Sequence, residues 1–362
     1  MKSEYRIQLH PPFIVGNEAK YAAEAIAKGD LALGEYIGWF ERMVADYMEV
    51  EYAVAVSSGT AALHLSLLAL DFMPSTRIAI PSLTFIAPVN AALYCQANVL
   101  LTDSDRDTWL MIPQVPPLDG FNLPVALYGS LFSTFPEDDQ VVDLSQAMGM
   151  KLHGSRFPAS HVATLSFNGN KTITTGSGGM VLTREKDLAD EVRFLANQAK
   201  LPGPDFVHPR IGYNYRMGNV AAAIGCAQME GIQEILNRQS YIDWTYRGAF
   251  RLDERLQFHG YPSECEPSRW LFTMLILEGR EKRDAVIRAL AEKRIESRPV
   301  FRPIHEYRPS LKTIGPLPNA TRIADCGISL PSGAGLTEEE QDKVCDIVLR
   351  ELGQQPPAKA GG

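Results

Sequence analysis

Residues 52–70, YAVAVSSGTAALHLSLLAL, indicate the fold class of this chain. The apolar run 52–56 is typical of a buried strand, and residues 60–70 have the apolar pattern of a helix with Thr60 near its start. Polar residues interrupt the stretch, so it does not fit a membrane span, which needs about 20 consecutive apolar residues. A strand followed by a turn and a helix is the repeating unit of α/β proteins.

Segments of the same two kinds continue along the first two thirds of the chain. The spacing of apolar residues predicts helices at 17–28 and 35–48 and one long helix at 219–250. Short strands are predicted at 77–81, 98–103, 123–129, 140–146 and 162–167. Strands that alternate with helical segments predict a mostly parallel central sheet covered on both faces.

The pattern changes after residue 245. A strand at 270–277 and helices at 282–293 and 337–352 flank a proline-rich loop, which is typical of a smaller α+β domain. We therefore predict a large domain at residues 1–245, a small C-terminal domain at 246–352 and a flexible tail at 353–362.

Composition limits the classes of function. The 362 residues carry a formal net charge of −8, so the chain lacks the excess of cations that binds nucleic acid or a membrane surface. A small anion needs only a few local donors and stays possible. The five cysteines include no CxxC pair, so neither a disulfide framework nor a metal site is expected. Residues 1–13 lack the apolar core of a signal peptide, and we expect a cytoplasmic protein.

The turn between the strand and the helix at residues 57–60 is a candidate phosphate site. The first backbone N–H groups of a helix have no partner within the helix, and together with the helix dipole they attract anions. Gly59 would let the backbone approach a ligand closely, and Thr60 would add a hydroxyl donor. An ordinary capped helix explains this string equally well.

The stretch VVDLSQA at 141–147 places a carboxylate at a strand end. Asp143 follows apolar strand residues and is expected at the carboxyl end of the sheet, where α/β proteins bind ligands. A carboxylate there can keep a ring nitrogen protonated, because a nearby opposite charge favours the charged form. Gln146 lies three residues further on, within reach of the same ligand. Taken alone, Asp143 could also cap a turn.

Lys171 stands alone in SFNGNKTITTGSGGMVLT, residues 166–183, among small and turn-forming residues. An ammonium group placed over a protein interior loses hydration, so its pKa falls and the neutral amine becomes a nucleophile that can form a Schiff base. Ser166, at the end of the preceding strand, could reach the same phosphate as Thr60. A lysine in an exposed turn is the alternative interpretation.

Five strings in this order resemble one family, the DegT-type sugar aminotransferases. They are SSGTAAL, PSLTF, VVDLSQA, SFNGNKTITTGSGGM and GYNYRM, and the resemblance extends over roughly residues 8–350. It implies the aspartate-aminotransferase-like fold, an α/β type I fold with a large domain and a smaller C-terminal α+β domain. It also implies an enzyme that uses pyridoxal 5'-phosphate (PLP).

The resemblance assigns roles to residues at matching positions. Lys171 matches the lysine that binds the cofactor's aldehyde and later moves protons, and Asp143 matches the partner of the ring nitrogen. Gln146 matches the residue beside the phenolic oxygen, and Phe85 matches an aromatic residue that stacks on the ring. The phosphate is expected to contact Gly59, Thr60 and Ser166.

The family also implies a homodimer with shared active sites. Asn214 in GYNYRM matches a polar residue that reaches the phosphate of the neighbouring subunit, and Arg216 and Asn219 are competing candidates for this contact. In the small domain, Arg302 and His305 match a region that lines the sugar site in relatives. For His305, a structural role in a loop between prolines is an equally good interpretation.

Within the family, several short stretches are most similar to one branch. Its members transfer an amino group, usually from L-glutamate, to the C4 ketone of UDP-4-keto-6-deoxy-N-acetylhexosamines. An alternative substrate is GDP-4-keto-6-deoxymannose, which gives perosamine. Ser177 replaces the glutamate of the TTGEGG string found in many members, and Gly218 replaces a Thr or Ser. A non-catalytic PLP-binding regulator is a further alternative, whereas Lys171 argues against a PLP-dependent C3 dehydratase, in which histidine replaces the lysine.

Overall fold

A computed structural model describes residues 5–72, 74–112, 120–131, 141–158 and 162–353. Apart from Gly353, the predicted C-terminal tail lies outside the described residues. In the described part of the chain, no helix combines the length and apolar character that crossing a membrane requires.

The central sheet consists of two groups of strands. One group has the order β1 (Tyr52–Val56), β8 (Gly179–Thr183), β7 (Val162–Ser166) and β5 (Val141–Asp143). The other has the order β13 (Lys312–Thr313), β3 (Asn98–Thr102), β2 (Arg77–Pro81) and β4 (Gly120–Asn122). A parallel bridge between Val125 and Asp143 connects the two groups. Pairing is parallel except along β8, which runs antiparallel to both neighbours, so the predicted mostly parallel sheet is confirmed.

Side chains from both faces of this sheet are buried. Alternate residues of β1 enter different apolar clusters, with Val54 and Val56 in one and Ala53 and Ala55 in the other. The first cluster includes residues of α3 (Gly59–Ala69), α4 (Ala87–Tyr94) and α5 (Lys186–Ala196). The second includes residues of α1 (Glu18–Lys28), α2 (Glu35–Met48) and α6 (Asn219–Glu230). Helices therefore cover both faces, as is typical of this sheet type.

The C-terminal part has its own sheet and core. Its strands have the order β12 (Arg298–Pro299), β14 (Gly327–Ser329), β11 (Thr273–Ile276) and β9 (Leu256–Phe258), and all their pairings are antiparallel. Two helices, α8 (Arg280–Glu292) and α11 (Glu338–Glu351), pack together beside this sheet. Shorter elements are η1 (Leu127–Gly129), β6 (Lys151–Leu152), β10 (Cys265–Glu266), α9 (Ile304–Tyr307) and α10 (Pro318–Cys326).

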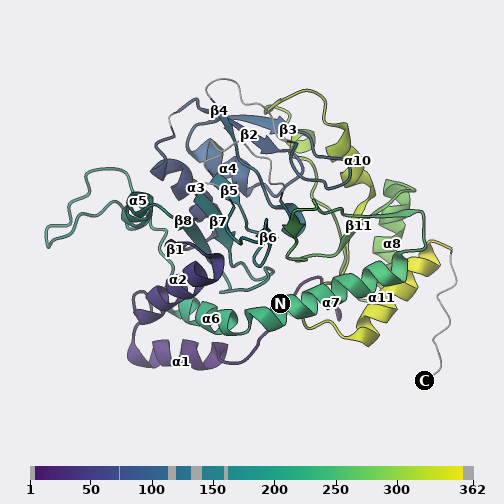
Figure 1. Ribbon diagram of the computed structural model, residues 1–362, viewed down its shortest axis with the longest axis horizontal. Helices are drawn as coiled ribbons and strands as arrows, with labels where there is room; N and C mark the ends of the chain where they lie inside the picture. Colours follow the sequence, from purple (N-terminus) through teal and green to yellow (C-terminus); the bar gives the residue numbers. More distant parts are fainter. Residues whose placement is uncertain (1–4, 73, 113–119, 132–140, 159–161, 354–362) are drawn as a thin grey trace.

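Helix α7 (Ile232–Phe250) leads from the large sheet to this second sheet (Figure 1). The domain boundary predicted after residue 245 lies within α7. Ile7 belongs to the apolar cluster of the C-terminal sheet and forms a bridge with Ile295, and β13 joins the large sheet. Each part of the chain therefore contributes a segment that packs with the other part, and the domain limits stay a prediction.

Two predicted elements are wrong. The single helix expected at 219–250 is two helices, α6 and α7, that meet at Gly231. The side chain of Val15 packs so closely here that a Cβ at residue 231 would lie 2.4 Å from its Cγ2. The strand expected at 123–129 contains the 3₁₀ turn η1, in which Tyr128 has a φ of 50°. Helices expected at 17–28 and 35–48 are confirmed by α1 and α2.

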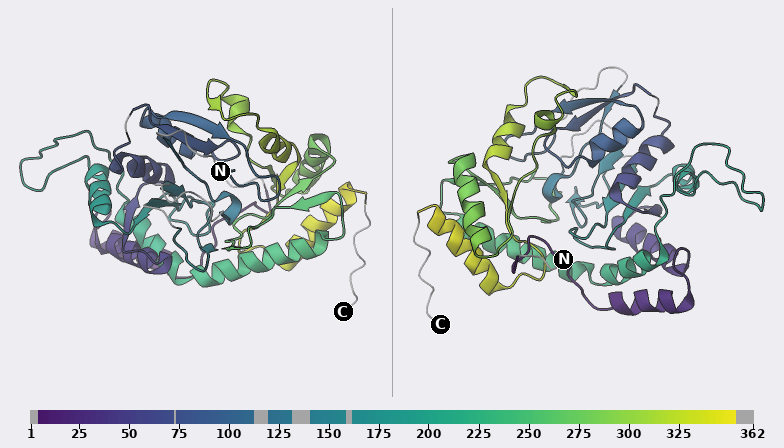
Figure 2. Two further views of the ribbon diagram at one scale, coloured as in Figure 1. Left: turned by 45° about the horizontal axis from the view of Figure 1, so that its top comes forward. Right: turned by 180° about the vertical axis from the view of Figure 1, so that it is seen from behind.

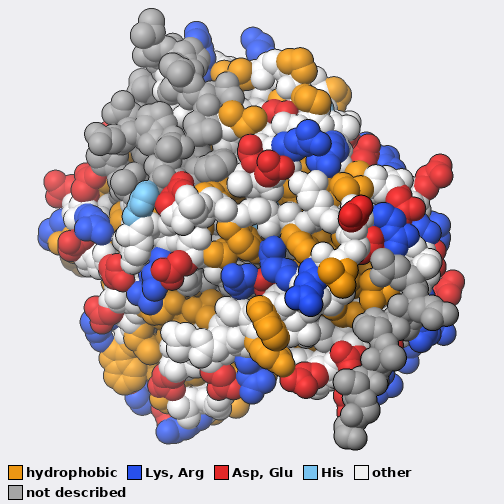
Figure 3. Space-filling model, turned by 45° about the vertical axis from the view of Figure 1, so that its right-hand side comes forward, with side chains coloured by type: hydrophobic (Ala, Val, Ile, Leu, Met, Phe, Trp, Pro, Cys, Tyr) orange, Lys and Arg blue, Asp and Glu red, His pale blue; other side chains and the backbone are white. Residues whose placement is uncertain are grey.

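The segment that follows α5 projects away from the body of the molecule in every ribbon view (Figures 1 and 2). We call residues 200–212 the projecting arm. It carries exposed apolar side chains at Leu201, Phe206, Val207 and Ile211. On the face shown in Figure 3, acidic and basic side chains are interspersed among apolar ones.

Candidate active site

A cavity of about 300 Å³ lies where β5 and β7 end and α3 begins. Its lining includes seven of the eight residues that the resemblance places around a cofactor: Gly59, Thr60, Phe85, Asp143, Gln146, Ser166 and Lys171. The carboxyl ends of parallel strands and the start of a helix therefore meet at one site, as expected for an α/β protein.

The start of α3 leaves space for an anion. Ser58 is the N-cap, and its Oγ accepts a hydrogen bond from the backbone N–H of Ala61 at 3.1 Å. A Cβ on Gly59 would lie 2.8 Å from the Cβ of Ser166 and 3.2 Å from the Oγ of Ser145. Only glycine therefore keeps the space between the helix start and these hydroxyl groups open. Backbone N–H groups and hydroxyl donors around such a space fit a phosphate group.

Asp143 ends β5 inside the cavity and is only 4% exposed. Its Oδ1 accepts hydrogen bonds from the backbone N–H of Ser145 at 2.8 Å and from the hydroxyl of Thr164 at 3.5 Å. Burial raises the pKa of Asp143, while the hydrogen bonds from Ser145 and the nearby Lys171 act in the opposite direction. A carboxylate with this degree of burial gains stability from a positively charged ligand atom.

Lys171 lies across the same cavity in a tight turn, where its backbone N–H donates to the carbonyl of Asn168 at 3.0 Å. Its Nζ is 4.2 Å from the centre of the Trp270 ring. Burial lowers the pKa of Lys171 to about 8, and the carboxylate of Asp143 limits the fall. The structure thus brings Lys171 and Asp143 into one electrostatic environment, and the lysine does not lie in an exposed turn.

Gln146 and Phe85 complete the part of the cavity expected from the sequence. The Oε1 of Gln146 accepts a hydrogen bond from the backbone N–H of Tyr128 at 3.1 Å, which fixes its amide group. Phe85 is 55% exposed, and its ring lies 6.1 Å from that of Phe301. An aromatic ring with this exposure at a cavity is available to stack on a planar ligand.

The lining also includes residues that were not predicted as site residues, among them Ser145, Trp270, Arg298 and Phe301. Ser145 follows Asp143 closely and could have been found from the strand-end position alone. The other three come from the last third of the chain, where sequence spacing gives no indication of which residues fold back onto the large sheet. Trp270 in particular has the sequence context of an ordinary core residue.

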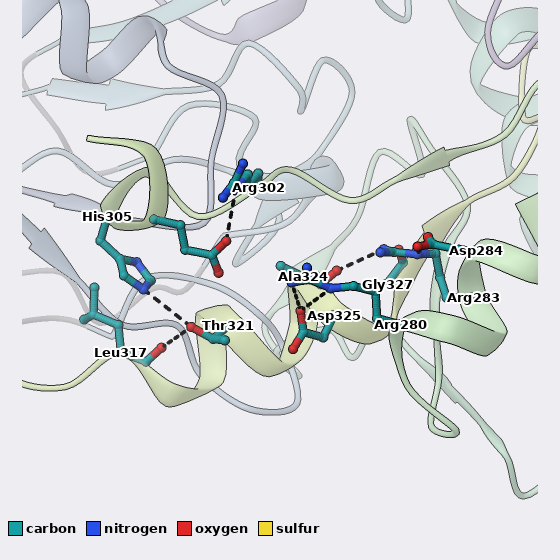
Figure 4. Close-up of polar contacts among 11 residues, drawn as sticks. Arg280, Arg283, Asp284, Arg302, His305, Leu317, Thr321, Ala324, Asp325 and Gly327 are labelled. Atoms are coloured by element: carbon teal, nitrogen blue, oxygen red, sulfur yellow. Dashed lines mark hydrogen bonds and ion pairs between the residues drawn. The ribbon is translucent and has the colours of Figure 1, made fainter. Parts of the chain in front are cut away.

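Arg302 and His305 are not among the residues that line this cavity. Figure 4 shows the polar contacts that they form instead. Arg302 is largely exposed, and its Nε is 3.1 Å from the carboxylate of Glu306. The Nδ1 of His305 is 2.8 Å from the hydroxyl of Ser82, and its Nε2 is 3.4 Å from that of Thr321. His305 lines a second cavity of about 660 Å³, which Arg280 and Asp325 also border.

The three residues considered for a contact with a neighbouring subunit differ in their surroundings. Asn214 and Arg216 are exposed, and neither lines the cavity of its own chain. Asn219 is buried, and its amide accepts from the backbone N–H of Tyr36 at 3.1 Å and donates to the carbonyl of Asp30 at 2.7 Å. Its side chain is therefore committed to contacts within its own chain.

Taken together, these residues fit PLP, because an open anion site, a buried carboxylate and a poorly hydrated amine lie around one cavity. Comparisons with known proteins agree. Residues 12–118 and 140–349 match the DegT/DnrJ/EryC1/StrS aminotransferase family, and the chain belongs to this family. It is a PLP-dependent nucleotide-sugar aminotransferase with the type I fold, so the expected enzyme class, cofactor and fold are confirmed.

Individual relatives align over nearly their whole length. The chain is 35% identical to the GDP-perosamine synthase of Caulobacter vibrioides over 94% of this chain and 96% of the relative. It is 32% identical to the GDP-perosamine synthase of Escherichia coli O157:H7, with 94% and 97% covered. A Bacillus subtilis relative named as a pyridoxal phosphate-dependent aminotransferase, EpsN, is 32% identical, with 95% of each chain covered.

Among solved structures, the fold is similar to that of Helicobacter pylori PseC, an aminotransferase involved in pseudoaminic acid biosynthesis. The TM-score is 0.89 at 19% identity, and 96% of this chain and 99% of the other are covered. At this identity the likeness concerns the fold. The curated relatives favour the GDP-linked alternative over the UDP-linked substrate to which the sequence analysis gave first place.

Proposed function

We propose that this enzyme transfers an amino group from L-glutamate to the C4 ketone of GDP-4-keto-6-deoxymannose. The observation that carries the proposal is the 35% identity to a GDP-perosamine synthase over 94% of the chain. Identity at this level over both parts of the chain is expected to preserve the site as well as the fold. The UDP-linked N-acetylhexosamine is the competing substrate.

The residues around the cavity divide the tasks of cofactor binding. The N-terminus of α3, with Gly59, Thr60 and Ser166, would hold the phosphate through backbone and hydroxyl donors. Asp143 would keep the ring nitrogen protonated, because its buried carboxylate favours a positive charge beside it and forms no ion pair in the described part of the chain. When bound, PLP supplies an electron sink for the carbanion that proton removal creates.

Lys171 is the base that this chemistry needs. Because burial lowers the pKa of Lys171 to about 8, a usable fraction of the amine is neutral near pH 7.5 and can accept a proton. Once protonated, the same group can return the proton to a neighbouring carbon. Beside a protonated ring nitrogen, Asp143 would stay ionised and would take no part in this transfer.

We also propose that the enzyme is a homodimer with shared active sites. The projecting arm exposes four apolar side chains, which is typical of a surface covered by another protein chain. Asn214 and Arg216 follow the arm directly and are exposed, so they are free to reach a second copy.

The substrate proposal is tested by offering PLP-loaded enzyme and L-glutamate with matched GDP- and UDP-linked 4-keto-6-deoxy sugars. We expect the GDP-linked 4-keto-6-deoxymannose to give a product with the mass of its 4-amino derivative, at a kcat/KM at least tenfold above that of the UDP-linked sugar. A preference for the UDP-linked N-acetylhexosamine would instead support the other substrate. Lys171→Ala enzyme is the control for non-enzymatic amination.

A further inference from the structure

We infer that Trp270 is a positioning residue that holds the Lys171 amine over its indole face and fixes the turn that carries this lysine. This inference rests on the proposed role of Lys171 but concerns a residue to which neither the family resemblance nor the comparisons assign a role.

The first observation is the contact between the two side chains. The Nζ of Lys171 lies 4.2 Å from the centre of the Trp270 ring, which is within the range of a cation–π interaction. In the described part of the chain, Nζ has no hydrogen bond or ion pair. The indole face is therefore the one close group in this region that stabilises the ammonium form, and Asp143 acts from further away.

The second observation concerns the backbone of the turn. The indole Nε1–H donates a hydrogen bond to the carbonyl of Asn170 at 2.7 Å. The adjacent Lys171 N–H bonds to the carbonyl of Asn168 at 3.0 Å, so both bonds hold the same turn. One side chain thus constrains the backbone on which the lysine stands and the amine at its far end.

The third observation is the setting of Trp270 itself. It is 2% exposed, and it precedes β11 in the sheet of the C-terminal part, while the lysine turn follows β7 of the large sheet. His10 packs against it, with 6.1 Å between ring centres. The indole cannot change its orientation without disturbing both the His10 ring and the turn that carries Lys171. The position of the lysine amine is therefore tied to the packing of the C-terminal part against the large sheet.

The experiment measures the proton affinity of Lys171 in PLP-free protein. Trace labelling with acetic anhydride across pH 6–11, with mass spectrometry of the peptide that contains residue 171, gives its titration directly. We compare the natural protein with Trp270→Leu, Trp270→Phe and, as a control, Trp244→Leu, since Trp244 is 70% exposed on α7.

In Trp270→Leu, which keeps the site apolar but removes the ring, the proton affinity of Lys171 should fall about tenfold because the ammonium form loses its aromatic partner. Trp270→Phe keeps a weaker ring face and should give a smaller fall, about threefold. Without the indole N–H, Trp270→Phe should also show faster amide exchange in the 168–171 turn. Trp244→Leu should match the natural protein in both measurements.

A rise in proton affinity in either Trp270 variant would overturn the inference, because it would mean that Trp270 acts by excluding water. Unchanged titration and unchanged exchange in Trp270→Phe would overturn it as well. If Trp270→Leu does not fold, Trp270→Phe alone decides between these outcomes. Both measurements on Trp270 variants are made without cofactor or sugar. A negative result in these measurements therefore does not affect the substrate proposal. A negative substrate test likewise does not affect the inference about Trp270.

Discussion

The Lys171 amine experiences two opposing effects. Burial lowers its pKa to about 8, while the Asp143 carboxylate and the Trp270 ring both favour the charged form. With a pKa near 8, roughly one tenth of the amine is neutral at pH 7. An ordinary surface lysine has only about one part in 2,500 neutral at that pH. The environment therefore supplies a nucleophile at neutral pH without a neighbouring base.

The sequence contained most of the information about these residues, but not all of it. Seven of the eight expected cofactor residues line one cavity: local pattern located the strand ends and the helix start, and the family resemblance supplied Phe85. Arg302 and His305 lie elsewhere in the described chain, and Trp270, Arg298 and Phe301 were missed. These depend on how the C-terminal part folds back, which local pattern does not encode. The roles of all these residues stay predictions.

At the scale of elements, the N-terminus of α3 determines whether the cavity can accept a phosphate. Ser58 caps the helix, Gly59 begins it, and Gly179 of β8 packs so closely that a Cβ there would lie 2.4 Å from the carbonyl carbon of Ser58. Two glycines thus bring the helix start and the strand into contact. Glycine at these positions follows from close packing, since neither has a positive φ.

We expect Gly59→Ala to weaken PLP binding about tenfold or more, because its Cβ would enter the phosphate space 2.8 Å from Ser166. The control is Gly38→Ala in α2, where the nearest atom to a Cβ is the end of the flexible Arg42 side chain at 3.4 Å. This control should bind PLP normally and gain up to about 1 kcal/mol in stability. Fluorescence titration with PLP measures the affinity of both variants. Equal affinity in the two variants would argue against the phosphate site.

The break between α6 and α7 shows that the apolar pattern of an element carries no information about its contacts with distant parts of the chain. The pattern continues through residue 231, so a single helix was predicted at 219–250, but Val15 from a distant part of the chain packs against Gly231. The strand predicted at 123–129 fails for a related reason. Its backbone turns at Tyr128, whose N–H bonds to Gln146 instead of a strand neighbour. In both cases the residue at which the predicted element ends has a tertiary contact that the apolar pattern does not include.

At the scale of the whole molecule, the chain contributes the cavity that contains Lys171 and Asp143, and a projecting arm. The alternation of strands and helices was enough to predict the sheet and its burial on both faces, and the change of pattern after residue 245 indicated a smaller α+β part. It could not predict the return of β13 to the large sheet or the contact of Ile7 with the C-terminal core. These long-range contacts connect the two parts, and Trp270, Arg298 and Phe301 of the C-terminal part line the cavity.

The proposed assembly predicts complementation between inactive chains. Lys171→Ala removes the base of one site, and Asn214→Ala would remove a phosphate contact supplied to the neighbouring site. After subunit exchange, a mixed dimer retains one site with both residues, so the mixture should recover up to about a quarter of the natural activity, since about half of the dimers are mixed. Mixing Lys171→Ala with Lys171→Arg is the control. Proven exchange without recovery would contradict a shared site.

The central claim is that the Lys171 amine binds the aldehyde of PLP, and covalent trapping tests it most directly. The protein is incubated with PLP, reduced with sodium borohydride, digested and analysed by mass spectrometry. We predict that the reduced cofactor is attached to Lys171 in the peptide that contains residues 166–183, and that Lys171→Arg protein carries none at this position. Attachment to a different lysine, or no attachment at saturating PLP, would contradict the account.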